Sequence, residues 1–375
     1  MKYFVASIPL LAGILFPFIN PGRLMASDFM LIAWNPGQEL LATGSVYSNY
    51  PYPLWTVVVM LPLTVWPLQT AMNLWFFLNI LMLAASLAMI FLLTDLELSP
   101  FLFGAAVLAS GFYLPVLSSS WLGQLSIFSL FILALTAYCF RHQRWTWLGV
   151  VLGLSFIKPQ VMIMLTGLIL LWALLHRRWQ TLLGFGGVIA LLTLISLPFI
   201  ASPGQIIGGG IASHLGAYIG KTSTIWGLSL ILGIPWFVPA LISIGLIAWL
   251  GVLWWPFLRQ EGAAFDRVLA LFSAAILVNL ITIPYSWMHN LTLLLLPIGY
   301  CLALALRMHG SVRYFWLALL FMIMHPLMLG LYVALYEPAH TQVYQVIPAM
   351  ALLPTMFYLE HQKNRSPGLV GKSVP

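Results

Sequence analysis

The sequence is poor in charged side chains and in cysteine. Only eight of its 375 residues are acidic and 15 are lysine or arginine, so charged residues make up 6% of the chain against 62% hydrophobic residues. No polar stretch is long enough for a separate soluble domain. The two cysteines, Cys139 and Cys301, predict neither a disulfide framework nor a metal site. Because the acidic residues are also too few for a divalent-metal site, we expect neither a metal nor another cofactor.

The net charge of +7 comes from basic residues that stand singly or in pairs between apolar runs. This distribution is typical of topology signals in membrane proteins, whereas a nucleic-acid-binding surface needs clustered charge. We therefore expect a lipid bilayer, and no nucleic acid, as a partner.

Apolar segments of near-membrane length recur along the whole chain. A spanning helix needs ~20 mostly apolar residues to cross a hydrocarbon core of about 30 Å. The pattern predicts an all-α polytopic membrane protein with about twelve transmembrane helices. The expected spans are residues 3–19, 70–93, 101–117, 125–140, 146–157, 159–175, 181–200, 235–257, 268–283, 290–306, 314–333 and 343–359. Two shorter stretches, 54–68 and 226–234, are broken by proline or glycine and predict interfacial or re-entrant segments on the outer side.

The basic residues also predict the orientation. With an uncleaved first span and the N-terminus inside, twelve of the 15 basic residues fall on the cytoplasmic side, as the positive-inside rule requires. We expect one transmembrane catalytic domain over residues 1–359, with long outer loops at 20–53 and 201–225. A short basic tail, 360–375, would follow in the cytoplasm. Most outlying polar residues then lie outside, so the predicted active site is extracytoplasmic, in a multi-pass protein of the inner or plasma membrane.

Asp28 lies in a polar stretch just after the first apolar segment. A charged side chain near the bilayer centre costs at least ~2.5–3.5 kcal/mol, so such residues are kept at interfaces, in cavities or at functional sites. A poorly hydrated carboxylate becomes more basic, which suits a general base that removes a proton from a hydroxyl. The pair Ser27-Asp28 also fits a helix cap before the apolar run that starts at Phe29. The local sequence leaves both roles open.

Lys158 is isolated between two apolar arms and is followed by Pro159. No acidic residue lies near it in the sequence, so a phosphate-bearing ligand would be a natural partner for the ammonium. The alternative is a lysine that extends its charged end to the outer interface.

Three further polar residues lie at the expected outer ends of spans. His289, in Trp287-Met288-His289-Asn290, could donate to a leaving phosphate or cap a helix beside an interfacial tryptophan. Lys221 closes an outer loop and could hold an anionic head group. Gln124 could bind a sugar or satisfy a neighbouring helix.

Several short motifs occur in an order that is typical of one enzyme family. They are Ser27-Asp28-Phe29, Gly44-Ser45-Val46-Tyr47, Tyr52-Pro53, Gly123-Gln124, Gly149 to Gly153, Ile157-Lys158-Pro159, Arg177-Arg178-Trp179, Thr222-Ser223 with Gly227, and Ser286-Trp287 with His289. In these motifs the chain resembles the polyprenyl-phosphate-mannose-dependent α-1,2-mannosyltransferases, which are membrane glycosyltransferases of the C superfamily.

The resemblance implies the C-superfamily glycosyltransferase fold, a polyprenyl-phosphate sugar donor and a glycolipid or glycan acceptor. The family's catalytic aspartate corresponds to Asp28 and its outer histidine to His289, and the donor-phosphate role falls to Lys158 and Lys221. Substrate contacts are expected from Gln124, Tyr47, Tyr52, Ser223 and Trp287.

The resulting hypothesis is an inverting glycosyltransferase that moves a sugar, mannose by this resemblance, to a hydroxyl acceptor. Asp28 would deprotonate the acceptor while Lys158, His289 and Lys221 stabilise the leaving phosphate. The alternative is a transporter or flippase of lipid-linked saccharides, which would use the same charged cavity without breaking a bond.

Overall fold

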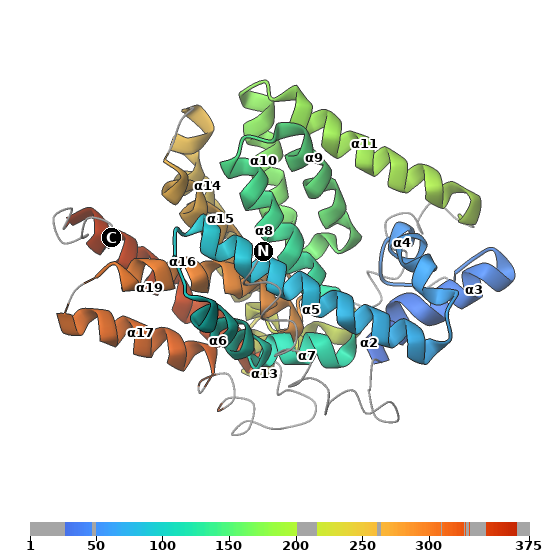
Figure 1. The fold of residues 1–375 in the computed structure, drawn as a ribbon, viewed down its shortest axis with the longest axis horizontal. Coiled ribbons are helices and arrows are strands. Elements are labelled where there is room, and N and C mark those ends of the chain that lie inside the picture. Colours follow the sequence, from blue (N-terminus) through green and yellow to red (C-terminus); the bar gives the residue numbers. More distant parts are fainter. Residues whose placement is uncertain are drawn as a thin grey trace.

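A computed structural model of the chain describes residues 27–46, 50–200, 216–260, 264–308, 310–325, 327, 330 and 343–365, and within these residues every regular element is a helix (Figure 1). The α-helices are α2 Ser27–Phe29, α3 Asn35–Thr43, α4 Leu54–Thr64, α5 Leu68–Leu93, α6 Pro100–Gly111, α7 Leu114–Leu122, α8 Ser126–Arg141, α9 Trp145–Leu154, α10 Ile163–Leu175, α11 Trp179–Ser196, α13 Ile225–Ile231, α14 Phe237–Arg259, α15 Phe265–Thr282, α16 Leu295–Leu306, α17 Gly310–Met324 and α19 Val346–Arg365. Short 3-10 or π turns occupy Met30–Trp34, Ser155–Ile157, Pro159–Val161, Leu197–Phe199, Ile219–Lys221, Met288–Leu294 and Val343–Gln345.

Five helices of the described residues are long and apolar enough to cross a membrane, or six spans if α6 and α7 count as one bent span. The long ones are α5, α11 extended to Phe199, α14, α15 and Met288–Leu306. Helices α4, α8, α10, α17 and α9 with its 3-10 extension are apolar but shorter. The chain is therefore an integral membrane protein of helical architecture, as expected, although these helices alone do not add up to the predicted set of twelve spans.

The expected spans agree with the helices to different degrees. The predicted segment 70–93 is α5 almost residue for residue, whereas the segment 101–117 is divided into α6 and α7, which meet at 67°. Pro115 in the first turn of α7 cannot donate a backbone hydrogen bond into a continuous helix, which explains the break. Helix α19 continues to Arg365, so the first residues of the expected tail are helical. The predicted span 3–19, much of loop 201–225 and residues 366–375 lie outside the described residues.

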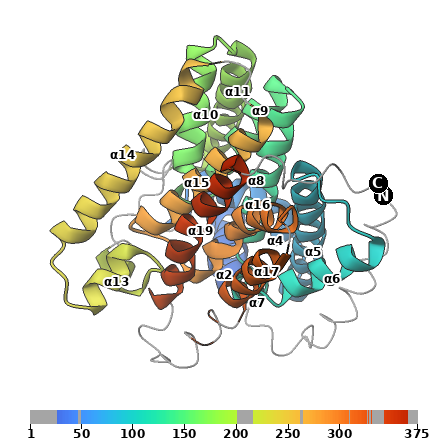
Figure 2. The same cartoon turned by 90° about the vertical axis from the view of Figure 1, so that its left-hand side faces the viewer.

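The helices enclose two apolar cores. The larger core is formed mainly by α5 to α10, α14 to α16 and α19, and α15 is buried along nearly all of its length. The smaller core joins α2, α3 and α4 to the start of α5, with Leu125, Ile157 and Leu192 closing it. In Figure 1, α3 and α4 lie at one side of the molecule and α17 and α19 at the other. Figure 2 shows α14 at the molecular edge, where it exposes most of its apolar side chains.

Glycines allow α9 and α11 to pack at very short range. A Cβ at Gly149 would overlap the carbonyl oxygen of Thr181, and one at Gly184 would lie 2.5 Å from the carbonyl oxygen of Thr146. Small residues permit this close approach of backbones in membrane helix pairs. Because Lys158 follows α9 by only a few residues, this contact fixes the helix from which the Lys158 turn begins.

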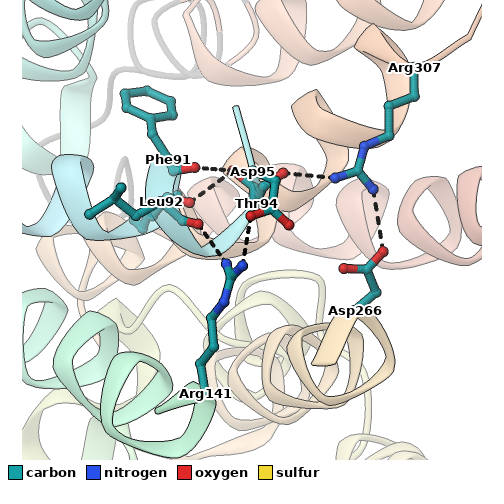
Figure 3. A network of polar contacts seen from close by, with 8 residues as sticks. Phe91, Leu92, Thr94, Asp95, Arg141, Asp266 and Arg307 are labelled. Atoms are coloured by element: carbon teal, nitrogen blue, oxygen red, sulfur yellow. Dashed lines mark hydrogen bonds and ion pairs between the residues drawn. The ribbon is translucent and has the colours of Figure 1, made fainter. Parts of the chain in front are cut away.

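A cluster of ion pairs, which we call the arginine clasp, ties α5, α8, α15 and α16 together (Figure 3). Arg141, at the end of α8, lies 2.7 Å from Asp95 and donates to the carbonyl of Leu92. Arg307 lies 3.3 Å from Asp266 and donates to the carbonyl of Thr94 at 2.8 Å. These side chains are 28–58% exposed, so the clasp lies at the surface of the helical bundle.

Candidate active site

The amide of Gln124 connects Asp28 to Lys158. Its Nε2 donates to Oδ2 of Asp28, and its Oε1 accepts a hydrogen bond of 3.1 Å from Nζ of Lys158. A carboxylate only accepts and an ammonium only donates, so this is the one orientation of the amide that satisfies both neighbours. The structure thus brings together three residues that the sequence analysis selected separately.

The ammonium of Lys158 is almost completely buried, with 1% of the residue exposed. Besides Gln124 it donates to Oγ of Ser126 at 3.0 Å. Burial disfavours the charged form and lowers the pKa of Lys158 to about 7, although the nearby charge of Asp28 opposes this shift. A buried lysine without a direct carboxylate contact among the described residues has a strong preference for a bound anion.

A line of hydrogen bonds, which we call the polar chain, continues from Lys158 into the later part of the sequence. Ser126 donates to Oδ1 of Asn290 at 2.9 Å, and Nδ2 of Asn290 donates to Oγ of Ser286 at 3.3 Å. The backbone N–H of Ser223 then donates to the carbonyl of Ser286 at 2.7 Å. The polar chain therefore reaches from Asp28 on α2 to the loop that contains Lys221, through side chains that are all buried beyond Asp28.

Asp28 and Gln124 are held together by close contact of their neighbours in the chain. Gly123 ends α7 with φ of +70°, and a Cβ there would lie 2.6 Å from Cβ of Phe29. Trp75 stacks on Phe29 with ring centroids 6.3 Å apart and donates from Nε1 to the carbonyl of Gly123 at 2.9 Å. The position thus requires glycine both for its left-handed backbone and for the space.

The turn that presents Lys158 is held from both sides. On one side, Trp55 donates to the carbonyl of Phe156 and Thr56 donates to that of Ile157, each at 2.9 Å. On the other side, Asn279 of α15 donates to the carbonyl of Gln160 at 2.9 Å and accepts from the N–H of Met164 at 3.2 Å. Side chains that replace the helical hydrogen bonds missing in this turn make it a rigid platform for the lysine.

The pKa of the Asp28 carboxyl is raised above its ordinary value, because burial outweighs the opposing effects of the Gln124 hydrogen bond and the Lys158 charge. A carboxylate of raised basicity can accept a proton from a hydroxyl more readily than a solvated one. Ser27 and Asp28 begin a helix of only three residues, and the Asp28 side chain is directed to Gln124 of another element.

His289 lies in the turn Met288–Leu294, next to the polar-chain residue Asn290, and is 4% exposed. The charge of Lys158 acts on its imidazole, which places the two side chains in the same neighbourhood. His289 therefore belongs to the buried region around Lys158.

Lys221 and Trp287 belong to a second, more exposed group beside the polar chain. Nζ of Lys221 lies 5.8 Å from the ring centroid of Tyr218, and that ring lies 5.8 Å from the ring of Trp287. The rings of Tyr285 and Trp287 have their centroids 6.1 Å apart. Tyr285 is also close enough to Asp28 for the charge of this carboxylate to act on its phenol.

The remaining predicted substrate contacts have different placements. Ser223 joins the polar chain through its backbone, whereas Tyr52 is buried in the smaller core, with its ring 6.0 Å from that of Tyr50. Tyr47 lies outside the described residues. Gln124 was expected to meet the sugar, but both ends of its amide are used by Asp28 and Lys158.

The sequence analysis assigned no role to Ser126, Asn290, Ser286 or Tyr285, although Ser286 and Asn290 lie in stretches that it named. The only signal for Ser126 was its position two residues after Gln124, and serine is too frequent at helix starts for this to be decisive. In the part of the chain that the structure describes, no three His, Cys, Asp or Glu side chains are grouped so that they could hold a metal ion.

The sequence matches a model of a known protein family. The sequence model described as Glycosyltransferase family 87 matches residues 50–284, which include Gln124, Lys158 and Ser223 but neither Asp28 nor His289. No curated protein and no solved structure matches the chain.

Proposed function

Since the chain belongs to glycosyltransferase family 87, we propose that this membrane glycosyltransferase moves a sugar, with mannose as the first candidate, from a polyprenyl-phosphate donor to a hydroxyl of a glycolipid or glycan. The observation that carries the proposal is the arrangement of a basic carboxylate and a buried ammonium at the two ends of the Gln124 amide. It offers one group for the proton that is lost and one for the phosphate that leaves.

Asp28 is the general base of the proposed reaction. Its carboxylate takes the proton of the acceptor hydroxyl while the oxygen attacks the anomeric carbon of the donor sugar. The bond from this carbon to the phosphate oxygen breaks, and its electron pair leaves with the polyprenyl phosphate. A single displacement of this kind inverts the anomeric configuration, and its base must be unprotonated before the reaction.

Lys158 is the main group that stabilises the leaving phosphate. An ammonium has three N–H donors, and two of them are directed to Gln124 and Ser126. The third is free, among the described residues, for a phosphate oxygen. Fixed, poorly hydrated charge is most effective where negative charge develops in the transition state. His289 would assist as a donor to the same phosphate or by fixing its orientation.

A lipid-linked donor suits the surroundings of this site. The site residues follow or precede apolar helices, and long helices such as α11 and α14 expose apolar side chains for most of their length. An isoprenoid tail can remain in the bilayer while its phosphate reaches Lys158. The basic residues of the arginine clasp lie at the other end of α8, so the positive-inside rule favours an extracytoplasmic site.

A transfer assay with the purified protein in nanodiscs tests the donor class. We expect transfer of radiolabelled mannose from polyprenyl-phosphate mannose and none from a nucleotide-linked mannose. Use of the nucleotide donor alone would show that the donor is wrong. Movement of the lipid-linked sugar across the bilayer without a new glycosidic bond would instead support the alternative function, a transporter or flippase of lipid-linked saccharides.

A further inference from the structure

The segment between α15 and the turn at Met288 has two chemically different faces. It is extended at Ile283 and at Trp287, and the chain bends at Pro284 and Tyr285 between them. Ser286 is fully buried and takes part in the polar chain, whereas Tyr285 and Trp287 are partly exposed. One face therefore supports the polar chain and the other presents two aromatic rings.

A second loop adds to the aromatic face. The N–H of Ser223 is bound to the carbonyl of Ser286, and Trp226 donates from Nε1 to the carbonyl of Thr282 at 2.8 Å. These two bonds attach the loop and the start of α13 to both ends of the segment. The ring centroid of Tyr218 is thereby placed 5.8 Å from that of Trp287, and Nζ of Lys221 lies over the Tyr218 ring.

We infer that Tyr218, Tyr285 and Trp287 form a subsite for a pyranose ring of the acceptor, the sugar whose hydroxyl Asp28 deprotonates. We call these three residues the aromatic subsite. The inference rests on the proposed transfer reaction and specifies where one of its two substrates binds.

The chemistry of the aromatic subsite fits a sugar better than a lipid tail or a phosphate. A pyranose has an apolar face of C–H groups, which packs on an aromatic ring, and a rim of hydroxyls. Phenol and indole groups combine such a ring with a polar edge, and Lys221 adds a donor at the rim. An isoprenoid tail would be better accommodated by the apolar faces of the long helices, and a phosphate by Lys158.

The position of the aromatic subsite favours the acceptor over the donor. In a single displacement, the attacking hydroxyl and the leaving phosphate lie on opposite sides of the anomeric carbon. Asp28 reaches Lys158 only through the Gln124 amide, and it also lies near enough to Tyr285 for its charge to act on the phenol. With the phosphate drawn to Lys158, a sugar ring that packs on Tyr285 lies near the base, as the acceptor must.

Binding without catalysis tests the aromatic subsite separately from the reaction. Saturation-transfer NMR would measure the affinity of the protein in nanodiscs for the methyl α-pyranosides of mannose, glucose and galactose. We expect at least one to bind, Trp287→Ala to weaken it about tenfold, and Trp287→Phe to weaken it by about threefold or less, because the phenyl ring keeps part of the packing. Trp236→Ala is the matched control, since Trp236 is 73% exposed at the start of α14 and should not affect binding.

Kinetics then distinguishes acceptor from donor. With the octyl glycoside of the sugar that binds, Trp287→Ala and Tyr285→Ala should raise the KM for the acceptor about tenfold and leave the KM for polyprenyl-phosphate mannose nearly unchanged. The inference is overturned if wild type binds none of the three pyranosides, if Trp287→Ala binds as well as Trp236→Ala, or if the KM for the donor rises instead. Binding that depends on Trp287 in a protein with no transfer from the lipid donor would overturn the proposed reaction and leave the sugar subsite in place.

Discussion

The two ends of α8 hold the same kinds of charged side chain in opposite surroundings. At one end, next to Ser126, Lys158 is buried and a neutral amide separates it from Asp28. At the other end, about 22 Å away for a helix of this length, Arg141 contacts Asp95 directly and both are partly exposed. Water screens the charges of this exposed ion pair. The arginine clasp is therefore suited to joining helices at the surface of the bundle, whereas the separated pair supplies the base and the cation of the proposed reaction.

The largest expected effect comes from removing the proposed base, Asp28. Asp28→Asn keeps the shape of the side chain but cannot accept a proton, so we expect kcat to fall ~10²–10⁴-fold. The measurement is transfer of labelled mannose by protein that elutes as a single species and keeps its melting temperature.

Asp95→Asn is the matched control at the other end of α8. It makes the same chemical change at a carboxylate that pairs directly with arginine, and it should leave kcat nearly unchanged. Equal losses in the two variants would show that the separated pair has no special role.

The next largest effect is expected from the cation. Lys158→Met has a similar length and no charge, and loss of one group that stabilises developing charge costs about 10²–10³ in kcat. Arg141→Met, measured in the same assay, should change kcat by less than about twofold. A Lys158→Met protein with normal turnover would contradict the phosphate role.

The pH dependence of activity is a second way to test the role of the buried cation, Lys158. Lys158 must be protonated to hold a phosphate, so kcat/KM for the donor should fall as the pH rises through the pKa of about 7 in the free protein. Lys158→Arg stays charged in this range and should lose this alkaline decline even if its activity is low.

A smaller effect is expected from the amide that separates the pair. Gln124→Leu removes the hydrogen bond that lowers the pKa of Asp28, so this pKa should rise further. Because the base works unprotonated, the acid side of the pH profile should move to higher pH, and kcat at the optimum should fall about tenfold. An unchanged acid side with a lower kcat would mean that Gln124 supports only the local packing.

The smallest effect on activity is expected in the arginine clasp. Arg307→Met removes contacts with Asp266 and with the carbonyl of Thr94, and should lower the free energy of unfolding by about 1 kcal/mol. Thermal unfolding in detergent measures this loss, and kcat per folded molecule should remain within about twofold of wild type. A large loss of kcat at unchanged stability would mean that the clasp acts on the site.

The sequence predicted the helical membrane architecture because apolar length is a local property. It predicted one span over residues 101–117 and missed the break between α6 and α7, since the apolar pattern continues through the bend at which Pro115 opens α7. Asp28, Gln124 and Lys158 were recognisable as polar exceptions in an apolar chain. Their contacts join residues 96 and 34 positions apart, and nothing local encodes such pairings.

The hydroxyl residues of α8 show why the polar chain could not be predicted. Ser129 and Thr136 donate to the carbonyls four residues earlier, a common local use of such side chains in helices. Ser126 instead contacts Lys158 and Asn290, and its neighbours in sequence give no sign of the difference. Only the packing of α8 against the turn at Met288 distinguishes it.

Gly123 has a consequence for any survey of variants of this protein. It has no side chain, yet its backbone lies against Phe29. Because Asp28 precedes Phe29 and Gln124 follows Gly123, this contact brings the two side chains within hydrogen-bonding distance. Even Gly123→Ala would displace the aspartate from its amide partner while sparing both side chains. In a saturation-mutagenesis map scored by glycan production, this glycine should therefore tolerate substitution as poorly as the aspartate does. Intolerance to substitution will then mark residues that hold the backbone in place as well as residues that take part in the reaction.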